Sequence, residues 1–211
     1  MERLDEAIFL ALNFDGGSAI DQAMFIISGR LTWLPLYLLI IYLIWRRYGW
    51  RTTLFAVLLI AAAVGLADQI CNLFKNGLQM LRPNHDADVM PLMHFPLRDG
   101  VPFVNKGLYG TVSAHASTTT AIAYLAHSFI HERLWRTAGV VAAATVAVSF
   151  VRRRWFTIVA FVWVAMICYS RIYLGAHFPS QVLAGIALGV LIGAAGVFVA
   201  RRCGLYNEPQ K

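Results

Sequence analysis

Long apolar stretches are the feature that most constrains what this chain can fold into. They cover residues 31–45, 53–74, 155–169 and 180–200. Because a helix rises about 1.5 Å per residue and a membrane core is about 30 Å thick, a span needs about 20 residues. The first and third stretches are therefore expected to borrow flanking residues. Hydrophobic residues make up 59% of the 211 residues and charged residues 14%, against about 45–50% and about 25% in soluble domains. The sequence predicts an all-α integral membrane protein.

The net charge of +7 does not indicate a nucleic-acid partner, because the basic residues sit in short clusters at the ends of apolar runs. The three cysteines have no paired or CxxC spacing. Neither a disulfide framework nor a zinc site is predicted from them, and no metal or other cofactor is expected. The partner that the composition indicates is the lipid bilayer.

Arginine clusters predict how the spans are oriented, because cytoplasmic turns are enriched in Lys and Arg. Clusters at 46–51, 152–154 and 201–202 mark cytoplasmic ends. The segments 75–113 and 171–177 then both fall on the extracytoplasmic side. This orientation requires residues 114–151 to cross the membrane a net odd number of times.

Residues 114–151 allow more than one arrangement. Either 137–151 crosses while 116–135 forms an outer interfacial helix, or one long helix is broken near His131–Arg136. If 116–130 and 137–151 both crossed, segment 171–177 would lie on the opposite side. The prediction is a polytopic helical bundle of five or six membrane helices.

The chain divides into three parts. Residues 1–30 are predicted to form interfacial helices, residues 31–202 the membrane domain with an outer loop at 83–112, and residues 203–211 a cytoplasmic tail. Within the last span, glycines at four-residue spacing place small residues on one helix face, which permits close packing; they are Gly185, Gly189 and Gly193. Packing within one chain is the favoured reading, and a homodimer interface is the alternative.

Three short polar clusters interrupt the apolar sequence. In the first, Lys75 and Arg82 are seven residues apart, which is two helical turns, so both are expected on one helix face before Pro83 ends the helix. A lysine offers a compact charge and an arginine a flat fork, and both suit phosphate oxygens. The alternative is a pair of interfacial residues that reach lipid headgroups.

The second cluster runs from Gly110 to His115. The glycine permits a tight bend, Ser113 offers a hydroxyl, and the backbone N–H groups near Ala114 and His115 stand at a helix start that favours anions. The alternative reading is a serine N-cap beside a surface histidine.

The third cluster contains Arg171, His177 and Gln181. His177 is predicted to lie in the turn between two helices, and Gln181 follows one helical turn later, within reach of its ring. A histidine nucleophile needs one ring nitrogen free and the other hydrogen-bonded. Together the clusters indicate a metal-free phosphoryl-transfer site at a membrane surface.

These residues resemble the motifs of the type 2 phosphatidic acid phosphatase (PAP2) superfamily, also called lipid phosphate phosphatases. That family carries K-x6-R-P, P-S-G-H and S-R-x5-H-x3-D. This chain has Lys75-x6-Arg82-Pro83, then V-S-A-H ending at His115, then S-R-x5-H-x3-Q ending at Gln181. The spacing and order match over about residues 33–200, and the sequence is similar to small bacterial members.

The resemblance implies a mechanism, a substrate class and a location in the cell. It implies that His177 attacks phosphorus to form a phosphohistidine, and that His115 protonates the leaving oxygen and then activates water. The phosphate oxygens would be held by Lys75, Arg82, Arg171, Ser113 and the backbone near Ala114. The substrate would be a phospholipid or isoprenoid (di)phosphate, such as phosphatidic acid, phosphatidylglycerophosphate, undecaprenyl diphosphate or lipid A phosphate. The site would face the periplasm from a bacterial inner membrane.

The chain departs from the family pattern at Val112, Ala114 and Gln181. Gln181 is the important change, because a glutamine can aim the His177 ring but lacks the charge that stabilises an imidazolium. The chain would then be slow, use another carboxylate such as Asp86, Asp88 or Asp99, or bind lipid phosphate without turnover. A lipid phosphotransferase is a further alternative.

Overall fold

The computed structural model describes residues 2–105, 107–131 and 143–206, and its described part is almost entirely helical. The long helices are α3 (Leu34–Leu78), α4 (Ala114–His131), α5 (Ala143–Tyr173) and α6 (Pro179–Arg202). The smaller elements are α1 (Glu2–Leu12), α2 (Gly17–Ser28), η1 (Leu31–Trp33), η2 (Pro83–His85) and a two-residue antiparallel pair, β1 (Leu97–Arg98) with β2 (Val101–Pro102). The predicted all-α membrane fold is confirmed.

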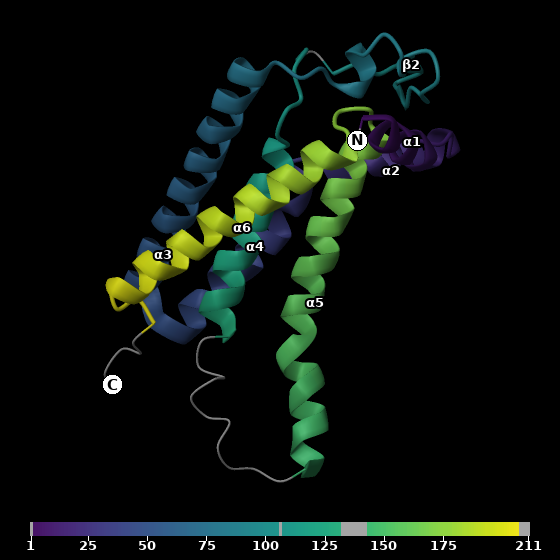
Figure 1. The fold of residues 1–211 in the computed structure, drawn as a ribbon. Coiled ribbons are helices and arrows are strands. Elements are labelled where there is room, and N and C mark those ends of the chain that lie inside the picture. Colours follow the sequence, from purple (N-terminus) through teal and green to yellow (C-terminus); the bar gives the residue numbers. More distant parts are fainter. Residues whose placement is uncertain (1, 106, 132–142, 207–211) are drawn as a thin grey trace.

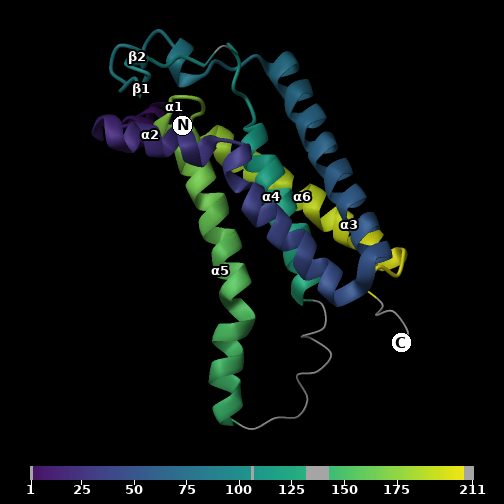
Figure 2. The same ribbon diagram turned by 180° about the vertical axis from the view of Figure 1, so that it is seen from behind.

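Three helical stretches of the described chain are long and apolar enough to cross a membrane: Leu31–Leu78, Trp155–Tyr173 and Pro179–Arg202. The first contains two of the predicted spans, because α3 bends at Gly49, where φ is 79° and ψ is 174°. A positive φ is open to glycine at little cost. The two arms of α3 run in opposite directions from this bend, as Figure 2 shows.

Helix α4 runs through the middle of the bundle, where it packs on α6, α3 and α5. Its first residue, Ala114, lies at the end that holds the polar loops, and its last turn reaches the bend of α3 (Figure 1). There the Tyr48 hydroxyl donates to the carbonyl of Phe129 at 3.0 Å, and the Arg47 side chain donates to the carbonyl of Ile130. Helix α4 therefore crosses the bundle, and for the described residues 116–131 the reading as an outer interfacial helix is wrong.

The modest hydropathy of α4 suggested an interfacial helix. It has a different cause: the small Ala and Thr side chains of α4 are buried against other helices. Helices buried in protein need not be strongly apolar. The predicted break near His131–Arg136 falls mostly on residues 132–142, outside the described residues. Residues 143–151 of the short apolar run belong to α5.

The glycines of α6 face α4. A Cβ atom added at Gly189 would lie 2.5 Å from the Ser117 carbonyl oxygen and 2.6 Å from Thr120 Cβ, and one added at Gly185 would lie 2.6 Å from the Ser113 carbonyl oxygen. At this spacing only glycine allows the two helices to approach so closely. The glycine face thus packs within one chain, as the favoured reading predicted, and α4 covers the surface that the homodimer reading would need.

Helices α1 and α2 lie across the end of the bundle that holds the polar loops (Figures 1 and 2). The buried Asp21 carboxylate fastens α2 there, because it accepts hydrogen bonds from the Tyr173 hydroxyl at 2.6 Å and the Leu97 N–H at 2.7 Å. It also contacts His94 Nε2 at 3.1 Å. Burial alone would raise the pKa of Asp21, but these hydrogen bonds outweigh it and lower the pKa.

Candidate active site

The three polar clusters of the sequence meet at one end of the bundle. The Ser113 N–H, just before α4, donates to the Gln181 carbonyl at 3.1 Å. The Arg82 Nη1 donates to the Ala176 carbonyl at 3.1 Å, and His177 Nδ1 lies 2.9 Å from the Gly110 carbonyl oxygen. Each contact joins two of the three clusters, so the predicted convergence is present in the structure.

Arg82 reaches the site by a different route from the one that its spacing predicted. Helix α3 ends at Leu78, because Gln79 adopts the left-handed conformation with φ 49° and ψ 34° and its N–H bonds the Lys75 carbonyl. The chain is then drawn away from the helix by a bridge between Leu81 and Tyr109. The prediction that Lys75 and Arg82 share one helix face is therefore wrong. Arg82 is instead anchored by its Nε, which donates to the Tyr109 carbonyl at 3.2 Å.

His177 lies between α5 and α6 and is 2% exposed. Its Nδ1 contacts two carbonyl oxygens, that of Gly110 at 2.9 Å and Oε1 of Gln181 at 3.1 Å. Since both partners only accept hydrogen bonds, Nδ1 carries the proton and Nε2 carries the lone pair. Burial, with Arg171 and Arg82 adding to it, holds the pKa of His177 well below its usual range. The His177 ring is therefore neutral, and its orientation is fixed by the two hydrogen bonds at Nδ1.

Gln181 is held in the orientation that this aim requires. Its Nε2 donates to the Leu81 carbonyl at 3.1 Å, so the amide oxygen is turned toward His177. A Cβ atom at Gly110 would lie only 2.6 Å from that oxygen. The predicted contact between Gln181 and the ring is present. Asp86, Asp88 and Asp99 were suggested as carboxylate partners for His177 in place of Gln181. None of them is among the described groups that contact His177 Nδ1.

Arg171, in the last turn of α5, is 8% exposed. Its Nη1 donates to Ser28 Oγ at 2.6 Å and its Nη2 to Asn105 Oδ1 at 3.5 Å, while its buried Nε has no partner among the described residues. A buried cation with an unused donor is costly unless an anion completes its coordination.

The described residues give this cluster no carboxylate within ion-pair distance. Three cations of the site form no ion pair with a carboxylate of the described residues: Lys75, Arg82 and Arg171. Gathered positive charge without a counter-ion is an arrangement suited to phosphate.

The start of α4 supplies the second histidine. Ser113 is fully buried, and its Oγ accepts a weak 3.4 Å bond from the Ala116 N–H, which is the N-cap role of the alternative reading. The first N–H groups of α4, near Ala114, begin at the site. His115 is half-buried and lines a cavity, so it is not a histidine of the outer surface.

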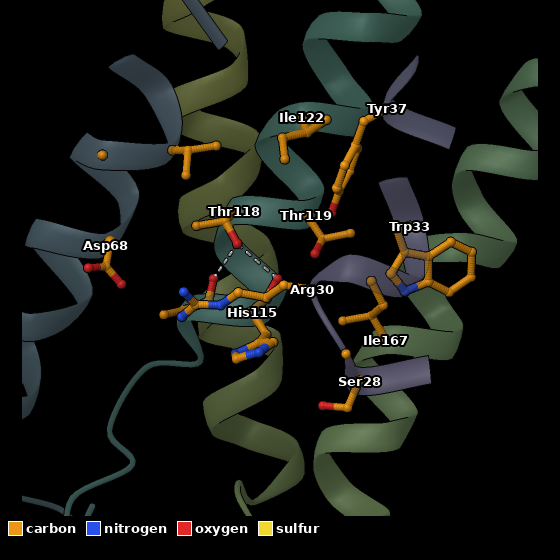
Figure 3. A pocket seen from close by; sticks show the side chains of 14 residues that line it. Ser28, Arg30, Trp33, Tyr37, Asp68, His115, Thr118, Thr119, Ile122 and Ile167 are labelled. Carbon is orange, nitrogen blue, oxygen red and sulfur yellow. Dashed lines mark hydrogen bonds between the residues drawn. The ribbon is translucent and has the colours of Figure 1, made fainter. Parts of the chain in front are cut away.

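That cavity has a volume of about 460 Å³ and opens beside His115 (Figure 3). Apolar and aromatic side chains line much of it, from η1, both arms of α3, α4 and α5: Trp33, Tyr37, Val64, Ile122 and Ile167. The ionisable residues of its lining include Arg30, Asp68 and His115. An amphiphile with a charged head and an apolar body matches this lining.

Sequence reasoning missed several residues that shape the site. Ser28 and Asn105 hold Arg171, and Arg30 lies in the cavity beside His115. None belongs to a recognisable motif. Only their position could have indicated them, since Ser28 and Arg30 lie at the end of α2 and just after it, and Asn105 lies in the outer loop. Two histidines of the outer loop contact other groups: His94 contacts Asp21, and His85 contacts the Asn105 carbonyl.

Comparisons with known proteins agree with this geometry. The model of the PAP2 superfamily matches residues 52–203. A lipid A 4'-phosphatase of Bacteroides thetaiotaomicron is 27% identical over 203 residues, which cover 94% of this chain and 78% of that protein. A lipid A 4'-phosphatase of Porphyromonas gingivalis is 24% identical over 191 residues, 90% of this chain and 70% of that protein.

A solved structure shares the fold. The PAP2-type phosphatidylglycerolphosphate phosphatase from Bacillus subtilis superposes with a TM-score of 0.65 at 20% identity, covering 95% of this chain and 86% of that one. The relatives are phosphoric monoester hydrolases by name, and the membrane-sized helices fit a multi-pass lipid phosphatase. With its three motifs gathered at one end of the bundle, the chain belongs to the PAP2 superfamily.

Proposed function

We propose that this chain hydrolyses the phosphate of a membrane lipid through a covalent phosphohistidine at His177. The observation that carries the proposal is the clamping of His177 Nδ1 between the carbonyl oxygens of Gly110 and Gln181. This clamp leaves the Nε2 lone pair available, and the low pKa keeps the ring neutral. A fixed, neutral imidazole is the nucleophile that attack on phosphorus requires.

The first step forms a bond from His177 Nε2 to phosphorus and breaks the bond from phosphorus to the lipid oxygen. His115 donates a proton to that leaving oxygen. In the second step His115 takes a proton from water, the water oxygen attacks phosphorus, and the bond to Nε2 breaks to release phosphate. One histidine thereby serves as acid and then as base. No metal takes part in either step.

The cations support this chemistry by stabilising charge on the phosphoryl oxygens. Arg171 has an unpartnered Nε, and neither Lys75 nor Arg82 is paired with a carboxylate among the described residues. Donors that are fixed before the reaction stabilise the transition state without reorganising. Ser113 and the first N–H groups of α4, near Ala114, are proposed to add to this cradle.

The arginine distribution supports an active site that faces the outside of a bacterial inner membrane. Arg46, Arg47 and Arg51 lie at the bend of α3, and Arg201 and Arg202 end α6, at the opposite end of the bundle from the site (Figure 1). The positive-inside rule places such clusters in the cytoplasm. Helices α1 and α2 cross the site end, which supports an interfacial position for residues 1–30.

The substrate class is a lipid-linked phosphate, and lipid A phosphate is the first headgroup to test because two relatives carry the name lipid A 4'-phosphatase. The test measures phosphate release from vesicles that contain lipid A, phosphatidylglycerophosphate or phosphatidic acid, with a chelator present. We expect release of free phosphate that a chelator leaves unchanged. Loss of activity on chelation would contradict the mechanism, and transfer of phosphate to another lipid would identify a phosphotransferase instead.

A further inference from the structure

Arg30 is presented to the site by a short, internally bonded turn. The Gly29 N–H donates to the Ile26 carbonyl at 3.0 Å, Thr32 Oγ1 donates to the same carbonyl at 2.5 Å, and Trp33 Nε1 donates to the Ile27 carbonyl at 2.8 Å. Two residues before Arg30, Ser28 is the partner of Arg171. The backbone of Arg30 is therefore fixed beside the site, although its side chain is exposed.

The Arg30 side chain enters the cavity that begins at His115. Figure 3 shows it reaching across the cavity, with its guanidinium group on the side of Asp68. The lining of this cavity includes His115 and Arg30 but not His177, Arg82 or Arg171. Arg30 therefore shares with His115 a cavity that His177 does not line.

Arg30 has no ion-pair partner among the described residues. It lies outside the three motifs that hold the reacting phosphoryl group. A cation at this place meets the part of a substrate that lies beyond the leaving oxygen, because His115 donates its proton to that oxygen and the cavity continues past it.

We propose that Arg30 forms a subsite for a second anionic group of the substrate, such as a second phosphate, on the lipid side of the bond that breaks. This subsite deepens the proposed function, on which it rests. Among the lipid phosphates that the family resemblance implies, this subsite favours those whose leaving group is itself anionic, and a lipid diphosphate is the simplest of them.

The chemistry of a diphosphate shows what this subsite contributes. His177 Nε2 attacks the terminal phosphorus, the bond from that phosphorus to the bridging oxygen breaks, and the electron pair stays on the bridging oxygen. The leaving group is then a lipid monophosphate, whose growing charge Arg30 stabilises as it forms. Water releases the phosphoryl group from His177 in the second step, as in monoester hydrolysis. A charge that grows during bond cleavage benefits most from a fixed cation.

The test compares an isoprenyl diphosphate with the isoprenyl monophosphate of the same chain length, both in neutral phosphatidylcholine vesicles. We expect Arg30→Ala to lower kcat/KM for the diphosphate by about 10- to 100-fold, the scale of one lost charge-assisted contact. For the monophosphate we expect little change. Arg30→Lys is expected to restore part of the loss. Arg3→Ala is the matched control, because Arg3 is exposed at the same end and lines none of the described cavities near the site.

A second measurement does not depend on turnover. On a His177→Ala background, we expect Arg30→Ala to weaken binding of the diphosphate and to leave binding of the monophosphate nearly unchanged. Equal effects on both lipids, in rate and in binding, would overturn the subsite and leave the proposed function intact. An effect that appears only with anionic vesicles would also overturn it, by showing that Arg30 binds neighbouring headgroups. A diphosphate-selective binding effect in a chain without turnover would instead retain the subsite and contradict the hydrolase.

Discussion

The Gln181 side-chain oxygen accepts a hydrogen bond from His177 Nδ1 at 3.1 Å, at the position where the PAP2 motif has an aspartate. A neutral amide therefore aims the nucleophile of this chain. The amide is turned by its own bond to the Leu81 carbonyl. Gln181 thus orients the ring without stabilising its positive charge, whereas an aspartate would do both.

Gln181→Glu places a carboxylate of similar shape beside His177. A nearby negative charge favours the protonated ring, so the pKa of His177 rises. Because attack requires neutral Nε2, the acid limb of the profile of kcat/KM against pH is expected to move to higher pH. Gln181→Asn, which shortens the side chain without adding charge, is expected to lower kcat while leaving the acid limb in place. An unshifted profile in Gln181→Glu would show that His177 is not the titrating nucleophile.

The wild-type enzyme is expected to stay active below pH about 6.5, the ordinary pKa of histidine. The reason is that burial keeps the pKa of folded His177 well below that range. The sign for stability is the reverse: as the pH falls below about 6.5, the unfolded chain binds a proton that the folded site excludes, so stability decreases. Initial rates and thermal unfolding measured from pH 5 to 8 check both effects. A steep loss of kcat/KM near pH 6.5 would contradict the buried neutral ring.

Gly110→Ala is expected to impair catalysis more than folding. The new Cβ atom would lie 2.6 Å from Gln181 Oε1 and 2.9 Å from Arg82 Cγ, so both side chains must move. We expect kcat to fall at least about tenfold, because misplaced catalytic groups are costly. Gly77→Ala is the control, since its Cβ atom meets nothing within 4 Å. Equal activity of the two variants would show that the close packing of Gln181 and Arg82 on Gly110 is not needed for catalysis.

Gly189→Val tests the packing of α6 on α4. The first added atom would lie 2.5 Å from the Ser117 carbonyl oxygen, which forces the helices apart. We expect a loss of about 1–3 kcal/mol in stability, typical of overpacking. Ala195→Val on an exposed part of the same helix should change little. Thermal unfolding in detergent measures both, and an unchanged Gly189→Val protein would place this face outside the bundle.

Asp21→Asn tests the attachment of α2. The carboxylate accepts bonds from Tyr173 and Leu97, and an amide retains these only in part. We expect a loss of about 1–3 kcal/mol, the cost of an unsatisfied buried group. Because the pKa of Asp21 is lowered in the folded state, its contribution is present above the unfolded value and is lost as the pH falls through the folded value. Asp88→Asn, at an exposed residue of the outer loop, is the control, and equal unfolding temperatures of the two variants would contradict the role of Asp21.

The sequence was sufficient to predict the helical membrane fold and the meeting of the three clusters. Apolar length and motif spacing are local properties, and His177, His115 and Gln181 could be placed by them. Arg82 was predicted at the site but on the wrong element, because the left-handed Gln79 that ends α3 has no sequence signal as clear as a glycine. The crossing of α4 was left open because small side chains that pack on other helices resemble an interfacial segment.

Other parts of the site depend on contacts between distant segments, which spacing does not reveal. Ser28 meets Arg171 across 143 residues, and Asn105 meets it across 66. The second acceptor for His177, the Gly110 carbonyl, is a backbone group whose position only the folded loop defines. Arg30 enters the cavity because the turn after α2 is fixed on the end of α5, a placement that required the tertiary structure.

The covalent intermediate tests the central claim most directly. Purified protein is mixed with a lipid carrying a radiolabelled phosphoryl group, quenched within milliseconds in base to preserve phosphohistidine, and digested to locate the label. We predict a transient, acid-labile phosphoryl group on His177 that is absent in His177→Ala and that turns over more slowly in His115→Ala. Phosphate release by the wild-type protein with no labelled His177 at any time would contradict the account.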